Sequence, residues 1–122
     1  MRDIQQFLKE FQRDMQWDIT DESYEKSYAS MLHNYMLLTT EVGEVAEEFR
    51  AIFNKTQKLI DEGMPKEEAF RYAKSLHQEN IGKELADCIA YIVKFANYLS
   101  IDLEDSFYAK MAEIKTRVNK DS

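Results

Sequence analysis

The scarcity of helix-breaking residues constrains the fold of this chain more than any other feature. Its 122 residues include only three Gly and one Pro. All-β folds need turn residues at frequent intervals, so this composition favours long helices. A chain of this length fits one domain with a real hydrophobic core. We therefore expect residues 1–122 to form a single all-α domain.

Apolar residues recur at helical spacing along nearly the whole chain. The polar stretch WDITDES and the turn DEGMPKEE interrupt this pattern, and Gly63 and Pro65 suit the end of one helix and the start of the next. The pattern predicts a four- to five-helix bundle. Its helical segments are expected at about residues 2–16, 24–60, 66–80, 82–99 and 103–118.

Charge and cysteine content narrow the class of partner and the compartment. A net charge of −7 disfavours binding to a nucleic acid polymer, although a metal ion can still bridge a nucleotide to an acidic site. The single Cys88 cannot form an internal disulfide, so a reducing cytoplasm is expected. No signal peptide and no membrane-spanning stretch are recognised in the sequence.

Two acidic pairs lie on separate helical segments. Glu41 and Glu44 lie in TTEVGEVAEEF, and Glu84 and Asp87 lie in GKELADCIAY. Residues three apart on a helix point the same way, one turn apart. Carboxylates beside an apolar seam repel each other and lose hydration, and a divalent cation compensates for that cost because hard ions prefer oxygen ligands. The pairs therefore predict a metal-dependent, phosphate-handling enzyme.

The phase of the acidic pairs predicts that they meet. The expected apolar seams run through positions 38, 42, 45, 49 and 52 and through positions 81, 85, 88, 92 and 95. Acidic residues lie one position out of step with each seam, so packing of the seams brings four carboxylates together between helices. A solvated acidic face is the alternative, because E-x-x-E is common in a chain with 23 acidic residues.

Two longer stretches resemble a known family. TTEVGEVAEEF, followed by KELADCIAYIVKFANYLSIDLEDSFYAKM, is similar to the MazG-like all-α nucleoside triphosphate pyrophosphohydrolases, especially the short members related to dCTP pyrophosphatase and the dimeric dUTPases. The family signature, E-x-x-E followed by E-x-x-D, is matched by the two acidic pairs. The resemblance covers about residues 36–117. It extends to Tyr91, Asp102-Leu103, Lys110-Met111 and Arg117.

This resemblance implies hydrolysis of a nucleoside triphosphate to the monophosphate and pyrophosphate, for nucleotide-pool house-cleaning or for monophosphate supply. Magnesium is the implied metal, with manganese as a substitute. Glu48 or its neighbour Glu47 is expected to act as an outer ligand or a water-positioning base, unless both belong to a solvated face. The metal-binding and catalytic carboxylates would be Glu41, Glu44, Glu84 and Asp87.

Several further residues are candidates for substrate binding. Lys110 and Arg117 are seven residues apart, share a helix face and would grip the β- and γ-phosphates. Lys94 could do the same, although a surface ion pair is the favoured alternative. Tyr91 is expected to pack on the sugar or base, or else at a helix interface. Trp17 is a candidate for contact with the base, or else a core or interface anchor.

The chain also departs from the family pattern. Many members have a glutamate where Thr40 stands and an asparagine where Ile114 stands. These departures keep open the alternative of a catalytically silent helical module that regulates or scaffolds a partner. The segment from Lys55 to Gly82 is longer than usual and is interpreted as a lid or a subunit contact.

A homodimer, or a tetramer built from dimers, is the expected assembly. The resemblance implies it, and the aromatic content of 12% together with six Met supplies apolar surface for it. Large apolar residues spread over more than one helix face, which is too wide for a single intrachain seam. They are Phe49, Ile52, Phe53, Phe95, Tyr98 and Phe107.

Overall fold

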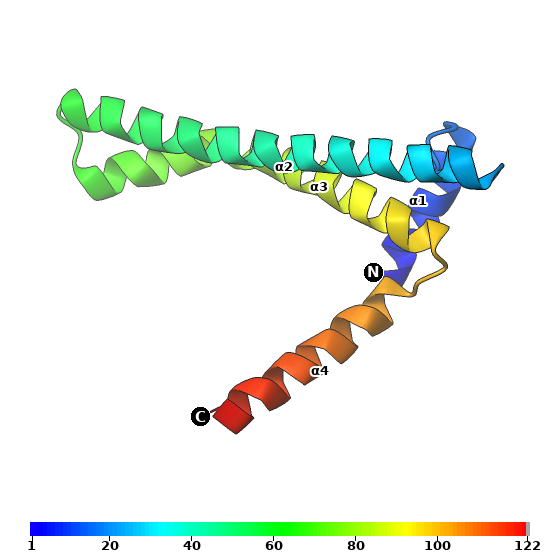
Figure 1. Cartoon of the computed structure of the whole chain (residues 1–122). Coiled ribbons are helices and arrows are strands. Elements are labelled where there is room, and N and C mark those ends of the chain that lie inside the picture. Colours follow the sequence, from blue (N-terminus) through cyan, green and yellow to red (C-terminus); the bar gives the residue numbers. More distant parts are fainter. Residues whose placement is uncertain (122) are drawn as a thin grey trace. The chain divides into compact units, whose positions relative to one another are not determined.

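The fold is all-helical, as the sequence predicts. The computed structural model describes the backbone of residues 1–121 and the side chains of residues 1–117, and this part of the chain contains no strand. Figure 1 shows the four helices that make up the fold. They are α1 (Arg2–Asp14), α2 (Tyr24–Asp61), α3 (Lys66–Tyr98) and α4 (Leu103–Asp121). None of these helices is long and apolar enough to cross a membrane within the described residues.

Helix α3 continues without a break through Asn80, Ile81 and Gly82. The expectation of a short helix that ends there is therefore wrong. A Gly inside a helix costs only about 1 kcal/mol relative to Ala. Contacts with α2 on both sides of Gly82, at His77 and at Glu84, hold this part of α3 in place and outweigh that cost. The segment from Lys55 to Gly82 forms the far end of the α2–α3 hairpin.

Helices α1, α2 and α3 end in the same hydrogen-bonded motif. In each, a residue with positive φ follows the helix: Gln16 (58°), Gly63 (104°) and Ser100 (55°). Its N–H donates to a carbonyl three residues back, and the next N–H donates to one five residues back, as in a Schellman motif. Trp17 occupies this last position after α1, and its ring packs edge-on against Phe11, with centroids 5.8 Å apart. Trp17 thus has a structural role at a helix end.

The N-termini of α2 and α4 are capped by side chains. Ser23 Oγ accepts from the backbone N–H of Lys26 at 3.2 Å and caps the start of α2. Asp102 Oδ1 accepts from the backbone N–H of Asp105 at 3.1 Å and caps the start of α4. These caps satisfy N–H groups that have no partner within the helix.

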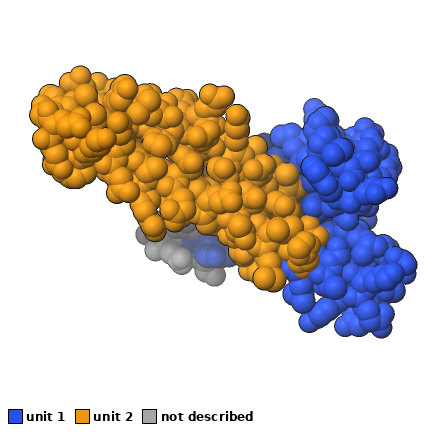
Figure 2. Space-filling model, turned by 90° about the horizontal axis from the view of Figure 1, so that it is seen from above, with its two compact units in different colours: residues 1–32, 92–122 blue, residues 33–91 orange. Residues whose placement is uncertain are grey.

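The chain divides into two compact units, which Figure 2 colours separately. Unit 1 contains Met1–Leu32 and Ile92–Ser122, and unit 2 contains His33–Tyr91. Helices α2 and α3 each contribute residues to both units. The units are described separately below.

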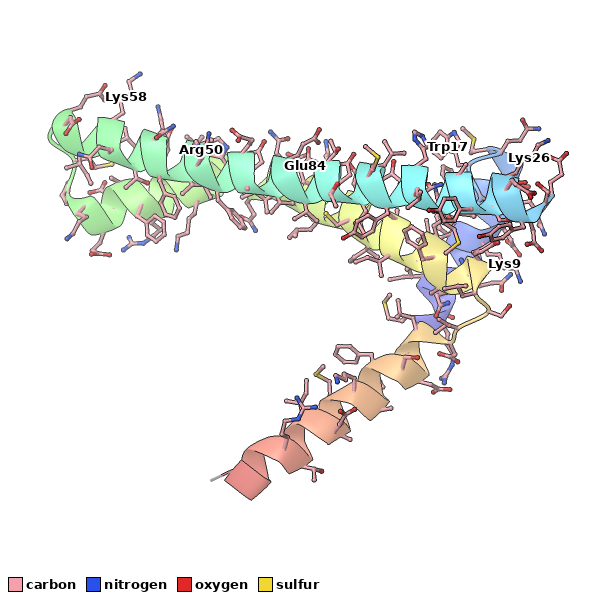
Figure 3. The ribbon with its side chains drawn as sticks, in the orientation of Figure 1. Lys9, Trp17, Lys26, Arg50, Lys58 and Glu84 are labelled. Atoms are coloured by element: carbon pink, nitrogen blue, oxygen red, sulfur yellow. The ribbon has the colours of Figure 1, made fainter. Side chains whose placement is uncertain are left out.

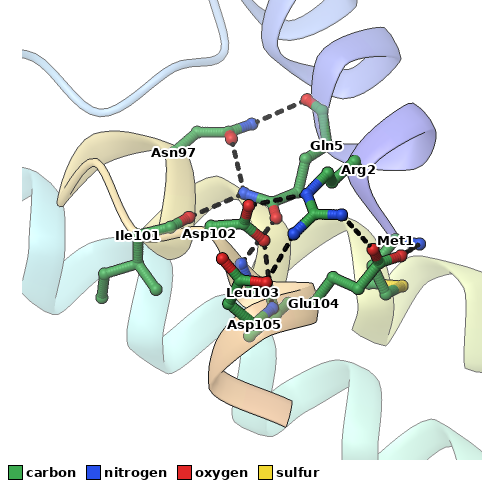
Figure 4. Close-up of polar contacts among 9 residues, drawn as sticks. All are labelled: Met1, Arg2, Gln5, Asn97, Ile101, Asp102, Leu103, Glu104 and Asp105. Carbon is green, nitrogen blue, oxygen red and sulfur yellow. Dashed lines mark hydrogen bonds and ion pairs between the residues drawn. The ribbon is translucent and has the colours of Figure 1, made fainter. Parts of the chain in front are cut away.

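In unit 1, Gln5 ties α1 to the α3–α4 turn (Figure 4). Its buried side-chain amide donates to Asn97 Oδ1 at 3.1 Å and to the carbonyl of Ile101 at 2.9 Å. Its oxygen accepts from the backbone N–H of Leu103 at 2.7 Å. Nearby, Arg2 binds the carboxylates of three residues at the start of α4, namely Asp102, Glu104 and Asp105.

In unit 2, α2 and α3 form an antiparallel hairpin with a narrow apolar core. Val45, Ile52 and Leu59 of α2 are buried at seven-residue intervals. Ala69 and Ala73 of α3 are fully buried, and their small side chains permit close approach of the two backbones. Towards the tip of the hairpin, Phe53 stacks on Phe70 with ring centroids 6.4 Å apart.

The hairpin packs about one position out of phase with the expected seams. Val42, Phe49 and Leu85, which we expect to be buried, are 55%, 46% and 47% exposed. Glu41 and Glu48 are instead half-buried, in line with Val45 and Ile52. The observed line is stabilised by the Glu48–His77 contact and by the burial of Ala69 and Ala73. Apolar residues of α2, such as Val42 and Phe49, are therefore left on the surface.

Candidate functional site

Three carboxylates from α2 and α3 meet in unit 2. One oxygen from each of Glu41, Glu84 and Asp87 lies within 4.8 Å of the other two. Glu41 and Glu84 are half-buried, whereas Asp87 is exposed. We call Glu41, Glu44, Glu84 and Asp87 the acidic cluster. Figure 3 labels Glu84 in this part of the hairpin.

Glu44 belongs to the cluster through hydrogen bonds. Its exposed side chain bonds the carboxyl groups of Glu84 and Glu41. The two E-x-x-E/D pairs therefore face each other across the hairpin, as the spacing predicts. The cluster occupies the helix interface itself, because Glu41 lies in the line of buried residues and not beside it.

The electrostatics of the cluster favour a bound proton or cation. The hydrogen bond to Glu44, burial and the charges of its acidic neighbours raise the pKa of Glu84 to about 7. Burial, followed by the charges of Glu44 and Asp87, raises the pKa of Glu41. Like charges contribute to both shifts, since carboxylates that are close together cannot all ionise without a compensating positive charge.

The donor set fits a divalent metal ion. Glu41 Oε2 and Glu84 Oε2 are both buried and accept no hydrogen bond from any described residue. Buried oxygens without a partner are costly. Carboxylate oxygens are the ligands that magnesium and manganese prefer. The residues that are present therefore suit a hard divalent cation bound by the acidic cluster.

Two further side chains lie in the electric field of the cluster. Burial and the charges of Glu41 and Asp87 raise the pKa of the Tyr91 hydroxyl. Burial, Glu41 and Asp87 also raise the pKa of the Cys88 thiol, which is half-buried. Tyr91 therefore remains a protonated hydroxyl beside the cluster. A thiol in this environment is a weak nucleophile.

Sequence reasoning missed a contact between Glu48 and His77. His77 Nδ1 lies 3.1 Å from Glu48 Oε2, and the two side chains are 23% and 24% exposed. The available signal is the seven-residue spacing, which places two residues on the same face of a helix. Glu48 lies seven residues after Glu41 on α2, and His77 lies seven residues before Glu84 on α3. Glu48 and His77 therefore lie on the same helix faces as the acidic cluster. Glu47, by contrast, is exposed and pairs with Arg50. Glu48 is therefore the stronger candidate for a role beside the cluster.

Lys110 and Arg117 lie in unit 1 on one face of α4, as expected. Both are exposed and contact the same carboxylate oxygen of Glu113, at 3.3 Å and 2.8 Å. The departures from the family pattern lie on helix surfaces. The Thr40 hydroxyl donates to the Met36 carbonyl of its own helix, and Ile114 is exposed on α4.

The two remaining candidates are found in unexpected settings. Trp17 is 54% exposed and is therefore not a core residue. Lys94 is only 8% exposed, so the favoured alternative of a surface ion pair is wrong. Burial lowers the pKa of Lys94, and the charge of Asp18 partly opposes that shift. Both residues belong to unit 1, which also contains a cavity described below.

Comparison with known proteins identifies the family. A sequence model of the MazG nucleotide pyrophosphohydrolase domain matches residues 29–120, which is well over half of the chain. That span includes all of the acidic cluster and all of α3. Neither the curated proteins nor the solved structures contain a significant match. The chain belongs to the MazG nucleotide pyrophosphohydrolase domain family.

Proposed function

We propose that this protein hydrolyses a nucleoside or deoxynucleoside triphosphate to the monophosphate and pyrophosphate, with a divalent cation held by the acidic cluster. The observation that carries the proposal is the meeting of these carboxylates, two of which have buried oxygens without a partner, in a member of this family. House-cleaning of the nucleotide pool is the proposed biological role.

The four carboxylates of the cluster would hold the metal, with Glu44 and Asp87 on its exposed side. Magnesium, when bound there, would neutralise phosphate charge and lower the pKa of a water molecule. Glu84, whose pKa is raised to about 7, must be deprotonated to act as a ligand. Glu48 is proposed to accept a proton from the attacking water, and His77 restrains its carboxylate.

Phosphate binding is proposed for the cations of α4. Arg117 offers a planar fork of donors, and Lys110 a compact positive charge. Glu113 holds both in the free protein, so a polyphosphate would compete with this carboxylate for them. The protonated hydroxyl of Tyr91 is proposed to contact the sugar or base, and Trp17 the base.

The active form is proposed to be a homodimer or a tetramer built from dimers. Tyr35, Val42 and Phe49 form an exposed line at seven-residue intervals on α2. Leu85 and Ile89 are large, exposed apolar residues on α3. Two-fold pairing would bury such lines in a closed assembly. We further propose that residues 1–122 act as one domain, because α2 and α3 each run through both units.

Pyrophosphate release tests the proposed function. Standard and damaged nucleoside triphosphates are each incubated with the protein and magnesium, and a matched sample contains a chelator. We expect pyrophosphate and monophosphate from at least one nucleotide, in the magnesium sample only. The proposal fails if every nucleotide remains intact, which would favour the silent regulatory module, or if phosphate and diphosphate are the products.

A further inference from the structure

Unit 1 contains a cavity that the proposed function does not use. Its volume is about 230 Å³, which is room for roughly seven waters and therefore for a phosphate or pyrophosphate group. Residues of α1, the α1–α2 connection and the end of α3 line it. The charged ones are Lys9, Arg13, Lys94, Asp18 and Asp21, and the others are Gln12, Ile19, Asn97 and Tyr98.

Two of the three cations at the cavity, Lys9 and Arg13, are not paired with an acidic side chain of the described residues. Lys9 and Arg13 lie one turn apart on α1, are exposed, and make no ion pair or hydrogen bond with any other described side chain. Some other cations of unit 1 are paired, such as Arg2 with three carboxylates and Lys26 with Glu22.

The two acids of the cavity are already engaged. Asp21 accepts a hydrogen bond from the Tyr98 hydroxyl at 3.3 Å. Asp18 acts on the buried Lys94, whose charge it stabilises. With Lys9, Arg13 and Lys94 against Asp18 and Asp21, the lining carries a net charge of +1, since 3 − 2 = 1. A negatively charged ligand is therefore the electrostatic complement of this cavity.

The chemistry of the lining selects an oxyanion. Seven of the nine lining side chains are polar or charged, and the other two are Ile19 and Tyr98. An arginine fork beside a lysine suits the tetrahedral oxygens of a phosphate group. We propose that this cavity is a phosphate-type oxyanion site, with Lys9 and Arg13 gripping the anion at its exposed side and Lys94 supplying positive charge from within.

The oxyanion could be free phosphate or pyrophosphate, or the phosphate of a nucleotide. None of the lining residues belongs to the acidic cluster, so binding requires no divalent cation and the inference stands independently of the proposed hydrolysis. Calorimetry of the full chain in the presence of a chelator tests it. Inorganic phosphate, pyrophosphate and a nucleoside monophosphate are titrated separately, each at low and high salt.

We expect one site per chain and weaker binding at high salt. Arg13→Gln should weaken binding about 10-fold or more, because a charge-assisted hydrogen bond contributes roughly 1.5–3 kcal/mol, and Lys9→Gln together with Arg13→Gln should abolish it. Lys26→Gln is the matched control, since it removes the same charge from unit 1 away from the cavity. Glu84→Gln should leave binding unchanged.

The preferred ligand identifies the source of the oxyanion. Tighter binding of the monophosphate assigns the site to a nucleotide, and equal or tighter binding of phosphate or pyrophosphate assigns it to the free anion. The inference is overturned if none of the three binds without metal. It is also overturned if Lys26→Gln weakens binding as much as Arg13→Gln does, because the effect would then reflect net charge alone.

Discussion

The carboxyl group of Glu84 on α3 hydrogen-bonds that of Glu44 on α2, and this contact is the largest cause that raises the pKa of Glu84 to about 7. Two carboxyl groups bond each other only when one of them retains a proton. In the metal-free cluster, Glu84 therefore keeps its proton to a higher pH than an ordinary glutamate does. A divalent cation would displace this proton, so metal binding and deprotonation are coupled.

The stability of the metal-free protein should fall as the pH rises from 5 to 8. The pKa of Glu84 lies near 7 in the folded chain and at the ordinary value of 4.5 in the unfolded one. Between these values the folded state binds more protons, so the stabilisation is complete below about pH 4.5 and is lost as the pH rises through 7. Thermal melts with a chelator at pH 5, 6.5 and 8 measure this trend.

Glu84→Gln is the control for this pH dependence, because glutamine keeps the shape of the side chain and cannot ionise. The variant should lose less stability than the wild type between pH 5 and 8, and saturating magnesium should reduce the trend in the wild type. An identical slope in the variant without metal would show that the titration arises elsewhere in the chain.

His77→Ala should destabilise the hairpin by about 1 kcal/mol. The substitution leaves the partly buried Glu48 without its partner, and partial exposure of both side chains limits the loss. Urea unfolding measures the change, and His77→Gln should recover part of it by retaining a donor. Glu47→Gln, on the exposed neighbour, is the matched control and should have little effect. A loss as large in Glu47→Gln would count against the Glu48–His77 contact.

Helix ends offer a test that is independent of the site. Gln16 has a φ of 58°, and Gly in its place relieves the strain of a side chain in the left-handed region. We expect Gln16→Gly to stabilise the protein by roughly 0.5–1 kcal/mol. Gly63 has a φ of 104°, so Gly63→Ala should destabilise it by about 1 kcal/mol or more. Chemical unfolding measures the stability of both variants. If Gln16→Gly and Gly63→Ala changed the free energy of unfolding by the same amount in the same direction, this account of the turns would be contradicted.

Assembly should depend on the exposed line of α2. Light scattering of the wild type should give a mass of at least twice the 14.4 kDa chain mass. Val42→Lys places a charge in the middle of that line and should shift the protein towards monomer. Thr39→Lys, at an exposed position off the line, is the control. A fully active wild-type monomer would refute the proposed dimer.

The sequence predicts the helices better than it predicts their packing. Scarce Gly and Pro and the helical periodicity place α1, α2 and α4, whereas α3 is predicted as two helices. The break at Gly82 is wrongly predicted because local propensity is weaker than contacts between helices that are distant in sequence. Such contacts cannot be read from a single helical segment.

The acidic pairs are predictable because their spacing and their family signature coincide. Which faces of α2 and α3 pack against each other is not predictable in the same way. The prediction assumes that apolar residues face the interior, and this chain leaves several large apolar residues exposed. Under that assumption Val42 is expected to be buried and Glu48 to be solvated, whereas Val42 is exposed and Glu48 is half-buried. The same assumption also concealed His77, whose partner lies 29 residues away on another helix.

Manganese titration, followed on the same samples as pyrophosphate release, tests the central claim most directly. Electron paramagnetic resonance counts bound manganese for the wild type, for Glu84→Gln and for Asp87→Asn. We predict that turnover in the wild type rises with the bound metal. Both variants should stay helical by circular dichroism, bind manganese more weakly and lose turnover about 100-fold or more, because a metal ion supplies several kcal/mol of charge stabilisation. Unchanged manganese affinity together with full turnover in both variants would contradict the account.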